Sequence, residues 1–140
     1  MILLTSELRA ALRANDIARR AAQQGAQREP DPVPVVKLLS PVGAATWLAT
    51  ELDADGDTLF GLADLGFGCP ELGSFSLAEI ASLRLPFGLA VERDLHFSTA
   101  HSLSAWAEAA RRAGSIIGAE RDLRRKVATG GGNELPSKGG

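Results

Sequence analysis

The chain has 140 residues, 45% of them hydrophobic and 23% charged, with a formal net charge of −2. These values are typical of one globular domain of ordinary size, and they argue against a general nucleic-acid-binding domain, which is normally basic. The single cysteine excludes an internal disulfide framework. The start of the chain contains arginines and does not resemble a signal peptide. No apolar run reaches the roughly 20 residues that a membrane span requires. We therefore expect a cytoplasmic protein.

Charge is unevenly distributed along the chain. Residues 38–83 contain seven acidic residues and no lysine or arginine, whereas both flanking segments are net basic. An acidic face of this kind could attract a cationic partner or a metal. The alternative, which we favour, is a sheet whose polar rim uses carboxylates that arginines of the flanking helices neutralise.

Residues 5–24 predict an amphipathic helix. Thr5 or Ser6 can cap its N-terminus, and Gly25 supplies its end. The predicted buried stripe contains Leu4, Leu8, Ala11, Leu12, Ile17 and Ala18. The opposite face is polar and basic, which is typical of a solvated helix face; phosphate or partner binding is the alternative.

Prolines at three alternate positions, 30, 32 and 34, favour an extended connector. The apolar runs that follow predict strands over residues 35–39, 45–52 and 58–67. The sequence DADGD joins the last two strands and has the aspartate spacing of a calcium loop. However, an EF-hand has its glycine at the sixth position, and Gly56 is the fourth residue counted from Asp53. The loop therefore predicts a β-hairpin.

Glu51 and Asp64 are the two acids of this hairpin that a catalytic pair could use. With a five-residue loop, Leu52 faces Thr58 and Thr46 faces Asp64, which puts the two acids on opposite faces of the sheet. With a four-residue loop they share a face but lie roughly 13 Å apart, beyond the roughly 5 to 9.5 Å of glycosidase pairs. Neither register predicts a catalytic pair.

The second half of the chain predicts shorter elements. A strand around residues 74–76 leads into a capping box, Ser76 with Glu79, which begins a short helix over residues 77–84. The expected buried residues of that helix are Leu77, Ile80 and Leu83. Short extended pieces over residues 89–92 and 95–97 precede a final helix, which starts at Ser102 or Ser104 and ends at Ala113 before Gly114.

Together these elements predict an α+β domain over residues 1–114, with a small antiparallel sheet of about four or five strands and helices packed on it. Residues 115–126 predict a basic helical extension that docks through Ile116, Ile117 and Leu123. Residues 127–140 are rich in glycine and predict a disordered tail.

Cysteine and histidine offer little chemistry. Cys69 has no partner cysteine and is predicted to be a small buried hydrophobe rather than a nucleophile. The spacing of His96 and His101 matches no established zinc signature. His96 alternates with Leu95 and Phe97, which favours a hydrogen-bonded structural histidine.

Three ordered motifs, PVVKLLSPVGAATWLATELD, FGLADLGFGCPELGSFSLAEI and GLAVERDLHF, carry a resemblance to a known family. Over roughly residues 3–114 the chain resembles the bacterial family labelled domain of unknown function 2958. The resemblance implies a small cytoplasmic protein with an accessory role in plasmids and integrative elements. It carries over no catalytic residues and no cofactor, because the family has no established activity. The residues that match its pattern include Trp47, Glu51, Asp64, Gly66, Pro70, Glu71, Leu72, Gly73, Glu92, Arg93, Asp94, His96 and Phe97.

The leading hypothesis is a non-enzymatic protein-interaction module of a bacterial mobile element, with an unidentified protein partner. The glycine-rich loop over residues 64–73 and the loop over residues 92–97 carry charged groups without a catalytic constellation, which is typical of a binding surface. The expected binding residues are Asp64, Glu71, Glu92, Arg93, Asp94 and His96. We expect no catalytic residue and no cofactor.

Two alternatives remain open. A metal-binding protein or metal-dependent enzyme would use Asp64, Glu71, Asp94 and His96. A nucleic-acid-associated protein would bind through two basic sets, Arg9, Arg13 and Arg20 in the first helix and Arg121, Arg124, Arg125 and Lys126 in the extension. In an inverse form of that alternative, the acidic sheet mimics DNA and occupies a DNA-binding protein.

Overall fold

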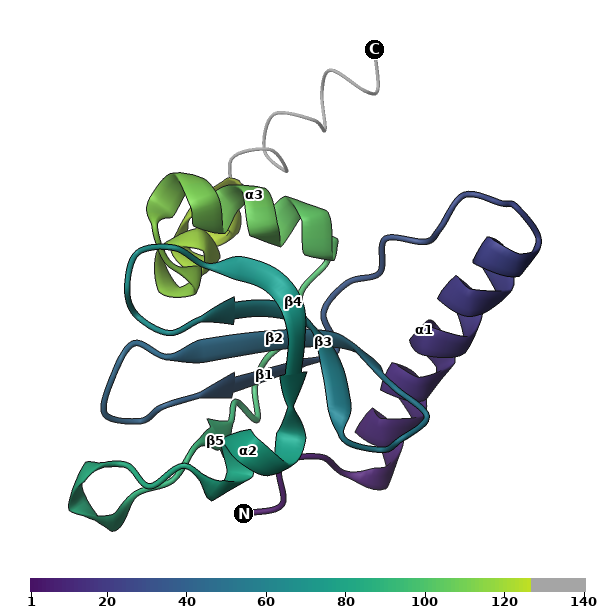
Figure 1. The fold of residues 1–140 in the computed structure, drawn as a ribbon. Coiled ribbons are helices and arrows are strands. Elements are labelled where there is room, and N and C mark those ends of the chain that lie inside the picture. The colour runs from purple at the N-terminus through teal and green to yellow at the C-terminus, as the bar shows by residue number, and fades with distance from the viewer. Residues whose placement is uncertain (127–140) are drawn as a thin grey trace.

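Five antiparallel strands form one sheet at the centre of the structure, a computed structural model that describes residues 1–126 (Figure 1). The strands are β1 (Val36–Leu39), β2 (Thr46–Leu52), β3 (Thr58–Asp64), β4 (Glu71–Ser76) and β5 (Glu92–Arg93). They lie in the order β4-β3-β2-β1-β5, so β1 to β4 form a meander and β5 pairs with the far side of β1. The predicted α+β fold is confirmed. The predicted tail lies outside the described residues.

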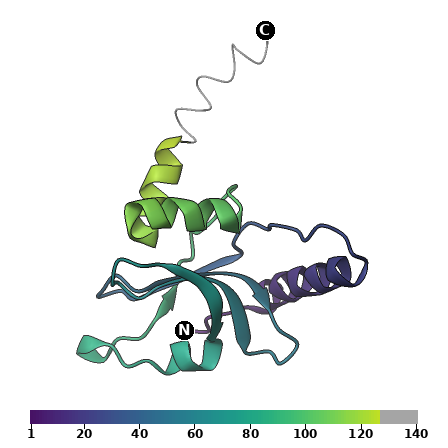
Figure 2. The ribbon, with the colours of Figure 1, turned by 45° about the horizontal axis from the view of Figure 1, so that its top comes forward.

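Helices cover both faces of the sheet (Figure 2). They are α1 (Ser6–Gln24), α2 (Leu77–Ser82), α3 (Leu103–Ala113) and the helical residues 116–126. The first apolar core joins α1 and α2 to the sheet and contains Leu12, Leu38, Trp47 and Ile80. The second core joins α3 and residues 116–126 to the opposite face of the sheet and contains Leu48, Leu62, Trp106 and Ile116. Alternate strand residues therefore serve two separate cores.

The ends of the two longer helices follow the predicted caps. The Thr5 hydroxyl accepts a hydrogen bond from the Leu8 N–H at 3.2 Å, and Gly25 follows the last residue of α1. The Ser102 hydroxyl caps α3, and Gly114 ends it with a φ of 79°. That positive φ explains the glycine, because other residues adopt it at a cost in free energy.

Several local predictions are wrong. The predicted buried residues Ala11, Ile17, Ala18 and Leu83 are exposed. β3 ends at Asp64 instead of continuing to residue 67, because the chain turns at Gly66 with a φ of 92°. Residues 95–97 form no strand, and α2 ends at Ser82 rather than at residue 84.

The β2–β3 hairpin combines both predicted registers. From Thr46↔Asp64 to Ala49↔Gly61 it follows the register of the five-residue loop, and the pair Leu52↔Leu59 follows that of the four-residue loop. A β-bulge between Ala49 and Glu51 changes the register, and Thr50 is the extra residue. The predicted hairpin turn is present, since the Asp53 N–H donates to the Thr58 carbonyl at 2.8 Å.

Candidate binding groove

A groove of about 630 Å³ lies beside the bulged end of the β2–β3 hairpin. Its walls come from the second half of α1, the proline-rich connector, the hairpin, β4 and the start of α3. Figure 1 shows the connector returning from the end of α1 toward the start of α3. There the Leu103 N–H donates to the Pro32 carbonyl at 2.9 Å, and the Ser104 N–H donates to Asp31 at 3.2 Å. These contacts hold the connector against α3 and close one side of the groove.

Asp16 is the charged residue at the base of the α1 wall, and it is only 2% exposed. It lies one turn after Leu12 on the buried face of α1. Three arginines surround it: Arg13 donates to its carboxylate at 2.7 Å, Arg19 at 3.3 Å and Arg20 at 3.1 Å. Burial by itself would raise the pKa of Asp16, but the hydrogen bonds from Arg13 and Arg20 outweigh it and lower that pKa. Asp16 is therefore an ionised, fully bonded anchor.

Arg19 and Arg20 connect this anchor to the acids of the hairpin. The Nε of Arg19 donates to Glu51 at 2.8 Å, and the Nη2 of Arg20 donates to Asp53 at 2.8 Å. The hydrogen bond to Glu51 raises the pKa of Arg19. Both arginines thus use their donors on carboxylates of the same groove, and the network ties α1 to the hairpin.

Acidic groups outnumber basic groups along the groove. The charged lining residues are Asp16, Glu29, Asp31, Glu51, Asp53, Arg19 and Arg20. The hydrogen bond from Ser104 lowers the pKa of Asp31, so this carboxylate also carries its charge at neutral pH. The floor between the acids is apolar, with Phe60 and Leu72 on the sheet and Leu103 on α3.

The groove opens onto an unpaired strand edge. β4 forms one edge of the sheet, and within residues 1–126 only β3 pairs with it. Its sequence, ELGSFS, contains none of the lysine or proline residues that commonly block an edge strand. Leu72 and Ser74 of β4 line the groove, and Leu72 is 48% exposed.

The structure places the predicted binding residues on opposite edges of the sheet. Asp64 and Glu71 belong to the β3–β4 edge, whereas Glu92 and Arg93 form β5. Three strand spacings separate β3 from β5, which corresponds to about 14 Å. The loops over residues 64–73 and 92–97 therefore belong to different edges of the sheet.

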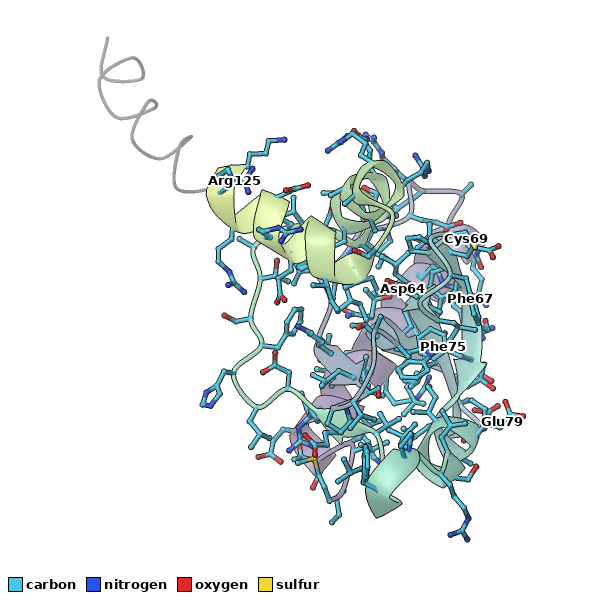
Figure 3. All side chains as sticks on the ribbon, turned by 90° about the vertical axis from the view of Figure 1, so that its left-hand side faces the viewer. Asp64, Phe67, Cys69, Phe75, Glu79 and Arg125 are labelled. Carbon is cyan, nitrogen blue, oxygen red and sulfur yellow. The ribbon has the colours of Figure 1, made fainter. Side chains whose placement is uncertain are left out.

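Three of those residues are bonded within the fold. Asp64 is fully buried and accepts hydrogen bonds from the N–H groups of Gly66 at 2.8 Å and Ile116 at 2.9 Å. Figure 3 shows its position inside the molecule. The Arg93 guanidinium donates to the carbonyls of residues 2 and 3, and Asp94 lies 3.6 Å from the ammonium group of Lys37. Glu71, Glu92 and His96 are exposed.

The ligands of the metal alternative lie apart for the same reason. Among residues 1–126 no three His, Cys, Asp or Glu side chains gather closely enough to hold a metal ion. Cys69 is exposed, so the prediction of a buried cysteine is wrong. It lies in the β3–β4 loop near Phe67, which is 83% exposed, and Figure 3 shows both side chains at the surface. This loop lies at the opposite end of the strands from the groove.

The two basic sets of the nucleic-acid alternative lie on opposite faces of the sheet. Arg13 and Arg20 pair with Asp16, and Arg9 donates to the Gly56 carbonyl. On the other face Arg124 pairs with Glu120 and Arg125 with Asp122, while Arg121 and Lys126 are exposed. The fold therefore separates the cations that this alternative would combine.

A family model described as a protein of unknown function (DUF2958) matches residues 3–117. The chain belongs to the DUF2958 family. The matched residues of this DUF2958 chain include α1, all five strands and α3. No match was found among curated proteins or among solved structures. Among residues 1–126 of the DUF2958 chain, no helix combines the length and the apolar character needed to cross a membrane.

Sequence reasoning missed the groove of the DUF2958 chain but could have found one part of it. Asp16 follows Leu8 and Leu12 at intervals of four residues, so it occupies a buried position of the helix. A carboxylate there requires cationic partners, and arginines stand three and four residues away. The contribution of the connector and of Leu72 carried no such signal, because both depend on how distant segments pack.

Proposed function

We propose that this chain is a non-enzymatic protein-interaction module that receives an extended segment of a partner protein along β4 and in the adjoining groove. The observation that carries the proposal is the unpaired, half-exposed β4 edge, which borders a groove of about 630 Å³. An exposed strand edge offers backbone donors and acceptors to an added strand, and neighbouring pockets then select its side chains.

The resemblance to a plasmid-associated family supports placing the partner in the machinery of a mobile element. The two alternatives have less support. The proposed metal ligands lie on separate edges of the sheet, and the proposed nucleic-acid contacts lie on separate faces.

The test is crosslinked affinity purification of the unsubstituted chain and of two variants from a host that carries the mobile element. Each sample is compared with and without nuclease treatment. Leu72→Glu places a charge on the groove side of β4, and Leu95→Glu is the matched control on an exposed leucine at the opposite edge. We expect a stoichiometric, nuclease-resistant partner that Leu95→Glu retains and Leu72→Glu reduces at least about tenfold. A partner lost from Leu95→Glu and retained by Leu72→Glu would move the binding surface to the 92–97 loop. A partner lost on nuclease treatment would favour nucleic acid.

A further inference from the structure

The acidic groove beside β4 has an unused acceptor at its centre. Glu51 is only 6% exposed and accepts from Arg19 through Oε1. Its other carboxylate oxygen, Oε2, accepts no hydrogen bond from residues 1–126, and Glu51 lines the groove. Among residues 1–126, His101 Nε2 is the only buried side-chain nitrogen or oxygen without a hydrogen-bond partner, so Glu51 Oε2 reaches the solvent of the groove and is open to a further donor.

The charges around Glu51 indicate whether a ligand of the groove would be cationic or anionic. Arg19 already donates to Asp16 and Glu51, and Arg20 already donates to Asp16 and Asp53. The groove therefore has acids in excess and its two arginines engaged, which disfavours an anionic ligand and favours a cationic one.

The shape of the groove suits a long side chain with a terminal charge. Phe60 and Leu72 provide an apolar floor along which the methylene stem of lysine or arginine can pack, and Glu51 and Asp53 line the same groove. Phe60 pairs with Glu51 across the hairpin, and Leu72 lies on the neighbouring edge strand. A strand added to β4 would alternate its side chains, so every second one would face this side of the sheet.

We infer that the partner segment carries an arginine or lysine whose charged group binds Glu51 Oε2 and Asp53 in the groove. This inference rests on the proposed function and specifies its ligand as a basic extended peptide. Glu51 supplies the acceptor that lines the groove. Asp53 lies at the rim, where it already accepts from Arg20.

The experiment selects a phage-displayed library of random nine-residue peptides against the full chain. We expect enrichment of peptides with a basic residue at one fixed position. Synthetic versions should bind Glu51→Gln about tenfold to hundredfold more weakly than the unsubstituted chain. Asp53→Asn should cause a smaller loss, and Glu92→Gln, on the opposite edge, should cause none. Because Asp53 is at the surface, its variant keeps the test valid if Glu51→Gln fails to fold.

The outcomes separate this inference from the proposed function. Two results would overturn the cation site but still support the β4 interface. In the first, the enriched peptides require Leu72 but share no basic position. In the second, their affinity is unchanged in Glu51→Gln and Asp53→Asn. If no peptide is enriched, or if Leu72→Glu binds the enriched peptides normally, both proposals fail.

Discussion

Three aspartates of the β2–β3 hairpin loop, Asp53, Asp55 and Asp57, each bind a different part of the fold. Asp53 pairs with Arg20 of α1 at 2.8 Å. Asp57 accepts from the Ala78 N–H at 2.8 Å and from the Ser76 hydroxyl at 2.7 Å, which ties the loop to the start of α2. Asp55 accepts from the backbone N–H groups of residues 57 and 58. An alternating acidic motif thus serves as three separate structural contacts.

Asp55 gives a pH-dependent prediction. Its hydrogen bonds from the Thr58 hydroxyl and from the backbone lower its pKa from 3.8 to about 2. Because the folded-state pKa is the lower one, the contribution of the carboxylate to the loop is fully present above pH 3.8 and is lost as the pH falls toward about 2. An NMR titration of the Asp55 side-chain carbon should give its midpoint near pH 2.

The matched variant is Thr58→Val, which removes the hydroxyl donor and keeps a β-branched residue at the start of β3. Its Asp55 midpoint should move up toward 3.8. A midpoint that is already near 3.8 in the unsubstituted chain would show that the loop hydrogen bonds do not form.

At the scale of elements, the bulge in β2 decides which side chains reach the groove. In a regular strand without the bulge, Glu51 would lie on the same face as Ala49, among the apolar residues of the first core. With the bulge, Glu51 pairs with Phe60 and lies beside the second core. Next to the bulge, β3 lies very close to β2, since a Cβ at Gly61 would lie 1.8 Å from the Leu48 carbonyl oxygen.

Gly61→Ala should therefore destabilise the hairpin strongly, because the backbone of β2 would have to move. We expect the free energy of unfolding to fall by about 3 kcal/mol, measured by urea denaturation. Gly73→Ala is the control on the neighbouring strand, where a Cβ meets no atom within 4 Å. Its effect should stay within about 1 kcal/mol. Equal denaturation midpoints for the two variants would contradict the close approach of β3 to β2 at Gly61.

At the scale of the whole molecule, the helical residues 116–126 complete the second core. Asp64 of β3 accepts from the N–H of Ile116 and so binds the first turn of this segment to the end of the sheet. Glu120 and Asp94 both lie close to the Lys37 ammonium, at 2.8 and 3.6 Å, which adds a polar link to β1 and β5. The segment predicted as a basic extension thus packs on the sheet as part of the same fold.

Two adjacent isoleucines test how far this segment contributes to stability. Ile116 is 0% exposed and Ile117 is 50% exposed. Ile116→Ala should lower the free energy of unfolding by about 3 kcal/mol, because it leaves a cavity in the second core. Ile117→Ala should change it by less than about 1 kcal/mol. If Ile116→Ala leaves the midpoints of thermal and urea unfolding unchanged, residues 116–126 are not part of the cooperatively folding unit.

Much of the fold follows from local features of the sequence. Helix caps were predicted correctly at Thr5, Ser76, Ser102 and Gly114. Capping depends on hydrogen bonds and backbone conformations that involve only a few neighbouring residues. The hairpin at residues 53–57 follows from the same local chemistry. The meander of β1 to β4 required only that consecutive short strands pair with their neighbours.

The site did not follow from such features. Asp64 and Arg93 have the residue types of a binding surface, and only packing revealed that one caps a helix and the other holds the N-terminal segment. The groove depends on a bulge whose position no local preference specifies, and on contacts between the connector and α3 across more than 70 residues. The sequence by itself determined the elements, since their free energies are local, whereas the tertiary structure decided which charges are paired and which acceptor remains free.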